Sequence, residues 1–81
     1  MQIHQVQLDN IYIPAERRKT LDMAKAAALA EDILENGLKI PIQVRFDGKR
    51  HVLIEGLHRM EASRLLGEAT ISAYLVQARK H

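Results

Sequence analysis

The sequence has no cysteine, and this absence removes three kinds of chemistry from consideration. Disulfide bonds, thiolate zinc sites and cysteine nucleophiles all need a thiol group, which none of the 81 residues supplies. No site in this chain can therefore depend on a thiol.

Paired histidines are also absent. His4, His51, His58 and His81 show no i, i+4 spacing on one predicted helix, the spacing that places two imidazoles beside one metal ion. No spacing of serine, histidine and aspartate indicates a catalytic triad. We therefore expect no protein-bound metal, and the sequence nominates no catalytic residue.

Long hydrophobic runs are missing as well. A membrane-spanning helix needs roughly 20 consecutive apolar residues, and no run approaches that length. The N-terminal segment lacks the charged and then apolar layout of a signal peptide. These absences predict a cytoplasmic protein that does not engage a membrane.

The net charge is small, at +2, so the chain has no overall basic field to attract nucleic acid. A nucleic-acid role would have to come from a local cluster of cations. Arg17, Arg18 and Lys19 form such a cluster. They are either a solvated basic loop or a contact to phosphate, in a nucleotide or in DNA.

The composition is that of a globular protein. Hydrophobic residues make up 47% of the chain and charged residues 27%. A chain of this length can form one hydrophobic core and no second one. We expect a single domain over 1–81.

Apolar periodicity predicts two main helices. The first covers 22–36, with Asp22 as its N-cap and Gly37 as its left-handed C-terminal stop. The second covers 57–66 and stops at Gly67. The residues expected on the buried faces are Met23, Ala26, Ala27, Ala30, Ile33 and Leu34 in the first helix, and His58, Ala62, Leu65 and Leu66 in the second.

Four strands are predicted, at 3–8, 40–46, 51–54 and 71–75. Asp47-Gly48 predicts a tight hairpin turn between the middle two. We expect a loop or a single turn over 9–20, because Pro14 restricts the residue before it to extended geometry. Residues 77–81 form a polar tail in this scheme. Helices and strands together indicate an α+β fold.

The segment 54–62 carries the clearest functional pattern, a strand that meets a glycine and then a helix. Gly56 lets a ligand approach the backbone closely. The first N–H groups of a helix are unpaired, and the positive end of the helix dipole lies behind them. Arg59 adds a planar fork that suits phosphate oxygens. The pattern predicts an anion-binding site.

An ordered set of motifs extends this pattern through the second half of the chain. It consists of Gly37-Leu38, Pro41-Ile42, Val44-Arg45, Asp47-Gly48, Leu53-Ile54, Gly56, His58-Arg59, Ala62 and Leu66-Gly67. With the order of predicted elements, this set resembles the ParB/sulfiredoxin superfamily over nearly the whole chain. It is most similar to the N-terminal domain of ParB-type partition proteins, also called the ParB-like nuclease domain. The resemblance implies a small α+β domain with a mixed sheet.

The resemblance also implies a ligand. In this superfamily the turn from glycine to helix binds nucleotide phosphates, those of CTP in ParB proteins and of ATP in sulfiredoxin. The loop at Arg17 and Arg18 corresponds to a region that approaches phosphates in ParB proteins. The residues that would face the phosphates are Gly56, Leu57, His58 and Arg59, and those that would lie near the nucleoside are Gly37, Leu38 and Pro41.

Two departures from the family pattern limit what the resemblance implies. Sulfiredoxin has its catalytic cysteine where this chain has Leu57, so reduction of a sulfinic acid is excluded. ParB proteins have a further arginine where this chain has Glu61, and they have an acidic residue after the glycine that is missing here. The missing acidic residue weakens the case for metal-assisted CTP hydrolysis.

Three functions follow as hypotheses. The first is a nucleotide-binding module that acts in DNA partition or regulation, beside DNA or a DNA-binding protein. The second is a ParB-like nuclease or nucleotide hydrolase, in which Glu55 and Glu61 would hold Mg²⁺ through the nucleotide. The third is a degenerate domain retained for protein contacts, including a homodimer.

Each candidate side chain also has a purely structural interpretation. Arg59 is otherwise a solvated surface charge, and the two glutamates are otherwise exposed charges. His58 is otherwise a partly buried histidine that donates a hydrogen bond to a nearby carbonyl.

Overall fold

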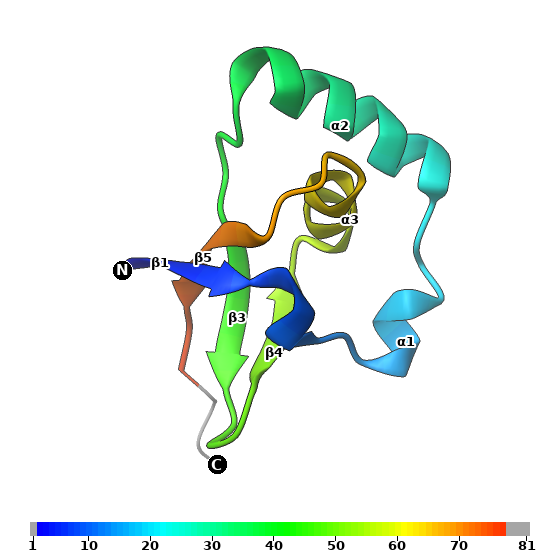
Figure 1. The fold of residues 1–81 in the computed structure, drawn as a ribbon. Helices are drawn as coiled ribbons and strands as arrows, with labels where there is room; N and C mark the ends of the chain where they lie inside the picture. Colours follow the sequence, from blue (N-terminus) through cyan, green and yellow to red (C-terminus); the bar gives the residue numbers. More distant parts are fainter. Residues whose placement is uncertain (1, 78–81) are drawn as a thin grey trace.

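Five strands form one mixed sheet in the order β1-β5-β3-β4-β2 (Figure 1). A computed structural model describes residues 2–77. The β3–β5 and β2–β4 pairs are parallel, and the β1–β5 and β3–β4 pairs are antiparallel. The strands are β1 (Ile3–Gln7), β2 (Ile11–Tyr12), β3 (Ile42–Phe46), β4 (His51–Glu55) and β5 (Thr70–Leu75).

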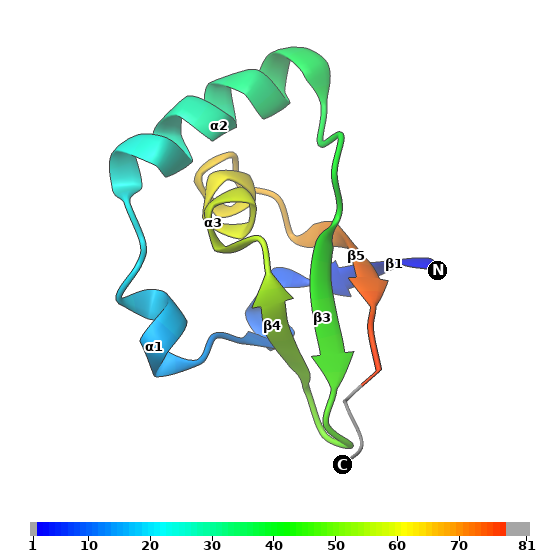
Figure 2. The same cartoon turned by 180° about the vertical axis from the view of Figure 1, so that it is seen from behind.

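Two longer helices form successive layers over the sheet. They are α2 (Met23–Asn36) and α3 (Leu57–Leu65), and α3 lies between α2 and the sheet (Figures 1 and 2). The 3₁₀ helix η1 (Leu8–Asn10) connects β1 to β2, and the one-turn helix α1 (Ala15–Arg18) lies between β2 and α2. The predicted α+β fold, with a mixed sheet and two main helices, is confirmed.

The core forms where α3 meets the sheet. Met60 of α3 and Ile42 of β3 have no exposed surface, and Leu53 of β4 and Leu8 of η1 are almost completely buried. The predicted alternation in β3 holds here, because Ile42 and Val44 are buried between partly exposed neighbours. Burial of such aliphatic side chains stabilises the fold by about 1.5–3 kcal/mol each.

The predicted hairpin between β3 and β4 is present. Asp47 Oδ1 accepts hydrogen bonds from the backbone N–H groups of Lys49 and Arg50, both at 2.9 Å. The N–H group of Arg50, and then that of Lys49, hold the pKa of the Asp47 carboxyl below its ordinary value. Gly48 has φ +101°, a conformation that glycine adopts without strain. The turn thus follows from its own residues.

The prediction of a loop over 9–20 was only partly correct. The single turn exists as α1, but Ile11–Tyr12 forms a strand, β2, with parallel pairing to β4. Ile11 and Ile13 are buried against the core. A strand of two residues has no alternation that a sequence pattern can reveal, so only its tertiary pairing with β4 defines it.

The predicted buried faces of the helices were also partly wrong. Ala26 and Ala30 of α2 are buried, but Met23 is 49% and Leu34 is 75% exposed. Figure 1 shows α2 running across α3, which is viewed nearly end-on, so only the middle of α2 meets its neighbour. Alanines suit such a close crossing because they keep the two backbones near each other.

In α3 the predicted face was rotated from the observed one. Leu57, Met60, Ala62 and Ser63 are buried, whereas Leu65 is 50% exposed. The strand predicted over 40–46 begins at Ile42, and Ile40 is exposed before it. Of the predicted polar tail, all but Gln77 lies outside the described residues.

Candidate anion-binding site

Gly56 joins the end of β4 to the start of α3, and two observations explain why glycine occupies this position. Its φ of +110° is a conformation that side-chain-bearing residues rarely adopt. A Cβ atom there would lie 2.6 Å from Cγ2 of Ile42 on the neighbouring strand. The turn therefore requires glycine both for its backbone conformation and for its packing against β3.

The first turn of α3 presents backbone donors. Gly56 is its N-cap and, as glycine, offers no side-chain acceptor to the N–H groups that follow. The first backbone hydrogen bond of the helix runs from the N–H of Met60 to the carbonyl of Gly56, at 2.9 Å. Leu57, His58 and Arg59 precede it, so their N–H groups are the donors that a helix start leaves outside its own ladder.

Backbone carbonyls of the segment that precedes β3 hold the side chain of Arg59 in place. Its Nη1 atom donates to the carbonyl oxygens of Pro41 at 2.8 Å and Ile40 at 3.1 Å. The side chain is therefore held in one direction and is not a freely solvated charge. A guanidinium has five N–H donors, so these two bonds leave others to face an anion. They also bring Pro41 next to the start of α3.

His58 connects α3 to α2. Its Nε2 atom accepts a hydrogen bond from the backbone N–H of Asp22 at 3.0 Å. Asp22 is the predicted N-cap, and its Oδ1 accepts from the N–H groups of Ala24 and Lys25. Accepting at Nε2 requires a neutral imidazole with its proton on Nδ1. The structural interpretation had His58 donating to a carbonyl, and the observed bond has the opposite direction.

The start of α3 opens into a cavity of ≈ 270 Å³, which we call the α3 cavity. It gathers the four predicted phosphate-facing residues and one member of the basic cluster. Arg18 and Lys19 of that cluster do not line it. Its lining residues are Arg17, Thr20, Leu29, Glu55, Gly56, Leu57, His58 and Arg59.

The lining of the α3 cavity contains two arginines and one glutamate. Arg17 and Arg59 approach it from separate elements, α1 and α3. Glu55 is the acidic member of the lining. Glu61, the other predicted magnesium ligand, lies with Oε2 3.8 Å from Nε of Arg64, outside the lining. The local balance of charge favours an anion.

The residues predicted to lie near a nucleoside divide between two places. Pro41 is linked to the α3 cavity through Arg59. Gly37 and Leu38 line a different cavity of ≈ 270 Å³, together with Ser63 of α3 and with Thr70 and its neighbours in β5. The structure thus brings Arg17 and residues 56–59 together and leaves Gly37 and Leu38 apart from them. A nucleoside contact at these positions stays a prediction.

Two lining residues were not nominated by sequence reasoning. Thr20 follows the basic cluster, and its Oγ1 donates to the carbonyl of Arg17 at 2.7 Å, which fixes the end of α1. Its adjacency to three cations was an available signal. Leu29 lies in the middle of α2, and no sequence pattern distinguishes it from other apolar positions of that helix.

Metal ligation has little support in the described part of the chain. No three or more carboxylate or imidazole side chains within residues 2–77 gather closely enough to hold a metal ion. A magnesium ion at the α3 cavity would thus depend on Glu55 and on the ligand itself.

Comparison with solved structures defines the class of fold. A crystal structure of sulfiredoxin from Arabidopsis thaliana aligns with a TM-score of 0.86 and 29% identity, over 96% of this chain and 88% of that one. The C-terminally truncated chromosome-partitioning protein ParB from Caulobacter crescentus, complexed with CTP-gamma-S, aligns with a TM-score of 0.81 and 19% identity. The fold is that of the ParB/sulfiredoxin superfamily.

The shared length differs among these structures. The match to ParB covers 99% of this chain and 47% of that one. A mutant free serine kinase in complex with AMP aligns with a TM-score of 0.78 and 17% identity, over 91% of this chain and 30% of the kinase. The chain thus spans about half of the partition protein and a smaller share of the kinase.

The family itself is defined by sequence. A family model described as the ParB N-terminal domain matches residues 1–81. The chain therefore belongs to the ParB N-terminal domain family, as its motifs predicted. A search of curated proteins finds no match to it.

Within the described residues, no helix has the length and apolar character needed to cross a membrane.

Proposed function

We propose that the α3 cavity binds the phosphate groups of a nucleotide, CTP or ATP, and that the chain acts as a nucleotide-responsive module in DNA partition or regulation. The observation that carries this proposal is the meeting of Arg17, Arg59 and the backbone start of α3 around one cavity. Two guanidinium groups and a helix N-terminus form a site complementary to a polyphosphate.

The arrangement assigns a role to each element. The N–H groups of residues 57–59 would donate to phosphate oxygens, and Arg59 would add a donor from a side chain already oriented by Pro41. Arg17 would approach from the opposite side, on α1. The base and sugar would then extend toward the segment before β3, near Pro41, with Gly37 and Leu38 further along.

Two of the aligned structures support a nucleotide as the ligand. The ParB structure contains CTP-gamma-S and the serine kinase structure contains AMP. Both share this fold at low identity, so they support the ligand class and leave the base open. If Mg²⁺ accompanies the nucleotide, it would offset the repulsion between Glu55 and the phosphates.

The hydrolytic alternative has less support. Phosphoryl transfer needs metal ions or an oriented base. Of the two glutamates considered for that role, Glu61 is near Arg64 and only Glu55 lines the cavity. We therefore propose binding as the function, with DNA, a DNA-binding protein or a second copy of the chain as downstream partners.

Adjacent arginines provide a matched test. Arg17 lines the α3 cavity and Arg18 does not. In calorimetric titration with CTP and ATP, with and without Mg²⁺, Arg17→Ala should weaken binding by about tenfold or more, because it removes a charged hydrogen-bond donor. Arg18→Ala should leave the affinity within about twofold of the parent value. Equal nucleotide affinities for the two variants would contradict the assignment of Arg17 as a phosphate-binding residue.

A further inference from the structure

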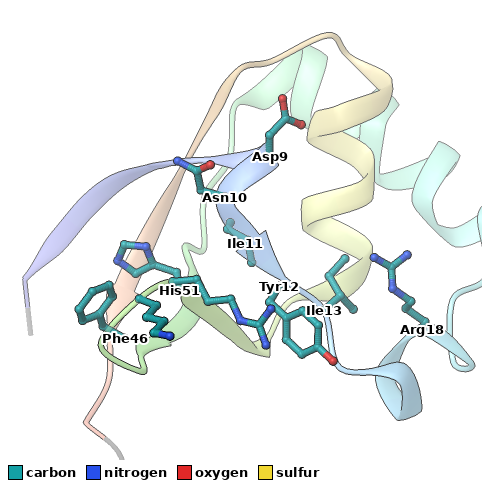
Figure 3. A pocket seen from close by; sticks show the side chains of 10 residues that line it. Asp9, Asn10, Ile11, Tyr12, Ile13, Arg18, Phe46 and His51 are labelled. Atoms are coloured by element: carbon teal, nitrogen blue, oxygen red, sulfur yellow. The ribbon is translucent and has the colours of Figure 1, made fainter.

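A larger cavity, of ≈ 590 Å³, is lined by residues of the edge strand β2, of the β3–β4 hairpin and of the segments beside them, with Arg18 from α1 (Figure 3). We call it the hairpin cavity. It shares no lining residue with the α3 cavity. The lining side chains used below are Tyr12, Arg18, Phe46, Lys49, Arg50 and His51.

Flat side chains are exposed in the hairpin cavity. Tyr12 is 41% and Phe46 is 50% exposed, although both are large hydrophobic residues. The guanidinium carbon of Arg50 lies 3.8 Å from the centre of the Tyr12 ring, and the rings of Phe46 and His51 are 5.3 Å apart. Arg50 covers one face of the Tyr12 ring, and the Phe46 and His51 rings are tilted by 52° to each other, so two groups of partly exposed planar side chains lie at the surface.

The charge around these side chains is positive. Arg18, Lys49 and Arg50 contribute cations to the lining, and Asp9 contributes the carboxylate. Asp9 is already bonded to Nη1 of Arg64 at 3.3 Å. Asp47, outside the lining, lies 3.6 Å from Nε of Arg50 and neutralises part of one cation. A surplus of positive charge remains.

Aromatic faces beside cations are the features that bind single-stranded nucleic acid. Unpaired bases stack on aromatic rings and on guanidinium planes, while lysines and arginines contact the phosphates between them. A duplex offers no free base faces within its stack, and a peptide of acidic residues alone has no rings to stack. Arg17 and Arg18 are consecutive residues that line the two different cavities, so α1 contributes one arginine to each lining.

We propose that the hairpin cavity binds a single strand of nucleic acid, with bases stacked on Tyr12 and Phe46 and with phosphates contacted by Arg18 and Lys49. This site is separate from the nucleotide site. It gives the chain a polynucleotide contact of its own, on strands and a hairpin.

The test uses fluorescence anisotropy with labelled strands of about twelve nucleotides, a length suited to single-strand sites. Oligodeoxythymidine and oligouridine distinguish DNA from RNA, a duplex of equal length tests strandedness, and polyglutamate tests charge alone. The single strands should bind at least about tenfold more tightly than the duplex. Binding that is equal for the duplex or for polyglutamate would overturn the proposal.

Variants locate the contact. Tyr12→Ala should weaken binding on the order of tenfold, and Tyr12→Phe, which keeps the ring, should restore it. Tyr74→Ala, on β5 and outside the hairpin cavity, is the control for loss of a tyrosine. If Tyr12→Ala binds as the parent does while remaining folded by circular dichroism, the proposal is wrong.

Salt dependence checks the phosphate contacts. Lys49→Ala should reduce the slope of log affinity against log salt by about 0.7, measured between about 50 and 200 mM, because one released counterion is lost. Lys39→Ala, outside the hairpin cavity, should leave the slope unchanged. Equal slopes for the two variants would contradict the assignment of Lys49. Mononucleotide titration of Tyr12→Ala separates the two sites, since its affinity for CTP or ATP should not change.

Discussion

At the residue scale, Gly56 has both a structural and a functional role. Its positive φ turns the chain from β4 into α3, and the missing Cβ lets β3 pass within contact of its backbone. The same turn exposes the N–H groups that form one wall of the α3 cavity. A substitution here should therefore affect folding before it affects binding.

Gly56→Ala should lower the free energy of unfolding by about 2–4 kcal/mol, from left-handed strain together with the clash against Ile42. Gly48→Ala is the matched control, because Gly48 has a similar φ of +101° and open space around its Cβ position. It should cost about 1 kcal/mol. Urea denaturation measures both. Equal losses would show that the contact with Ile42 contributes nothing.

Most residues that line the α3 cavity were named from the sequence, but Thr20, Leu29 and the hydrogen-bond partners were not. A glycine before basic residues at a helix start indicates the turn and its donors. The bonds from Arg59 to Ile40 and Pro41, and from Asp22 to His58, join residues that are distant along the chain. Such bonds depend on how the helices pack, which no local pattern encodes.

At the scale of elements, the link between α2 and α3 positions one wall of the α3 cavity. Asp22 caps α2 with its side chain, and its backbone N–H donates to His58. Asp22 thus caps the start of α2 with its side chain and links it to the start of α3 with its backbone. The cap was predictable because aspartate before an apolar periodic segment has a known local role, whereas the acceptor role of His58 was not.

Asp22→Ala should lower the free energy of unfolding by about 1 kcal/mol, because two N–H groups at the start of α2 lose their acceptor. Asp32→Ala, on the same helix, removes only an exposed hydrogen bond with Asn36 and should cost less than about 0.5 kcal/mol. Thermal or chemical unfolding compares the two. A loss for Asp32→Ala as large as that for Asp22→Ala would argue against the capping role.

The sequence did not predict β2, because this strand is short and pairs with a strand that is distant along the chain. β3 follows from its alternation, and β4 follows as the returning strand after the Asp47-Gly48 turn. β2 has two residues and exists through parallel pairing with β4. The failure has a consequence for function, because β2 carries Tyr12 to the hairpin cavity.

At the scale of the whole molecule, two cavities of different character each have one residue of α1 in their lining. The α3 cavity has a helix start and two guanidinium groups, which suit a polyphosphate. The hairpin cavity has exposed rings among cations, which suit unpaired bases. The family and the fold place the chain among ParB N-terminal domains, and the two proposed sites would let such a domain bind both a nucleotide and a polynucleotide.

The most direct test of the central claim is an NMR titration of the domain with CTP, ATP, GTP and UTP, with and without Mg²⁺. Nucleotide binding at the start of α3 should shift the backbone amides of residues 56–59, with further shifts at Arg17 and Thr20, which line the same cavity. One nucleotide should produce them at the lowest concentration and thereby identify the base. Unchanged amide positions with all four nucleotides would contradict the claim.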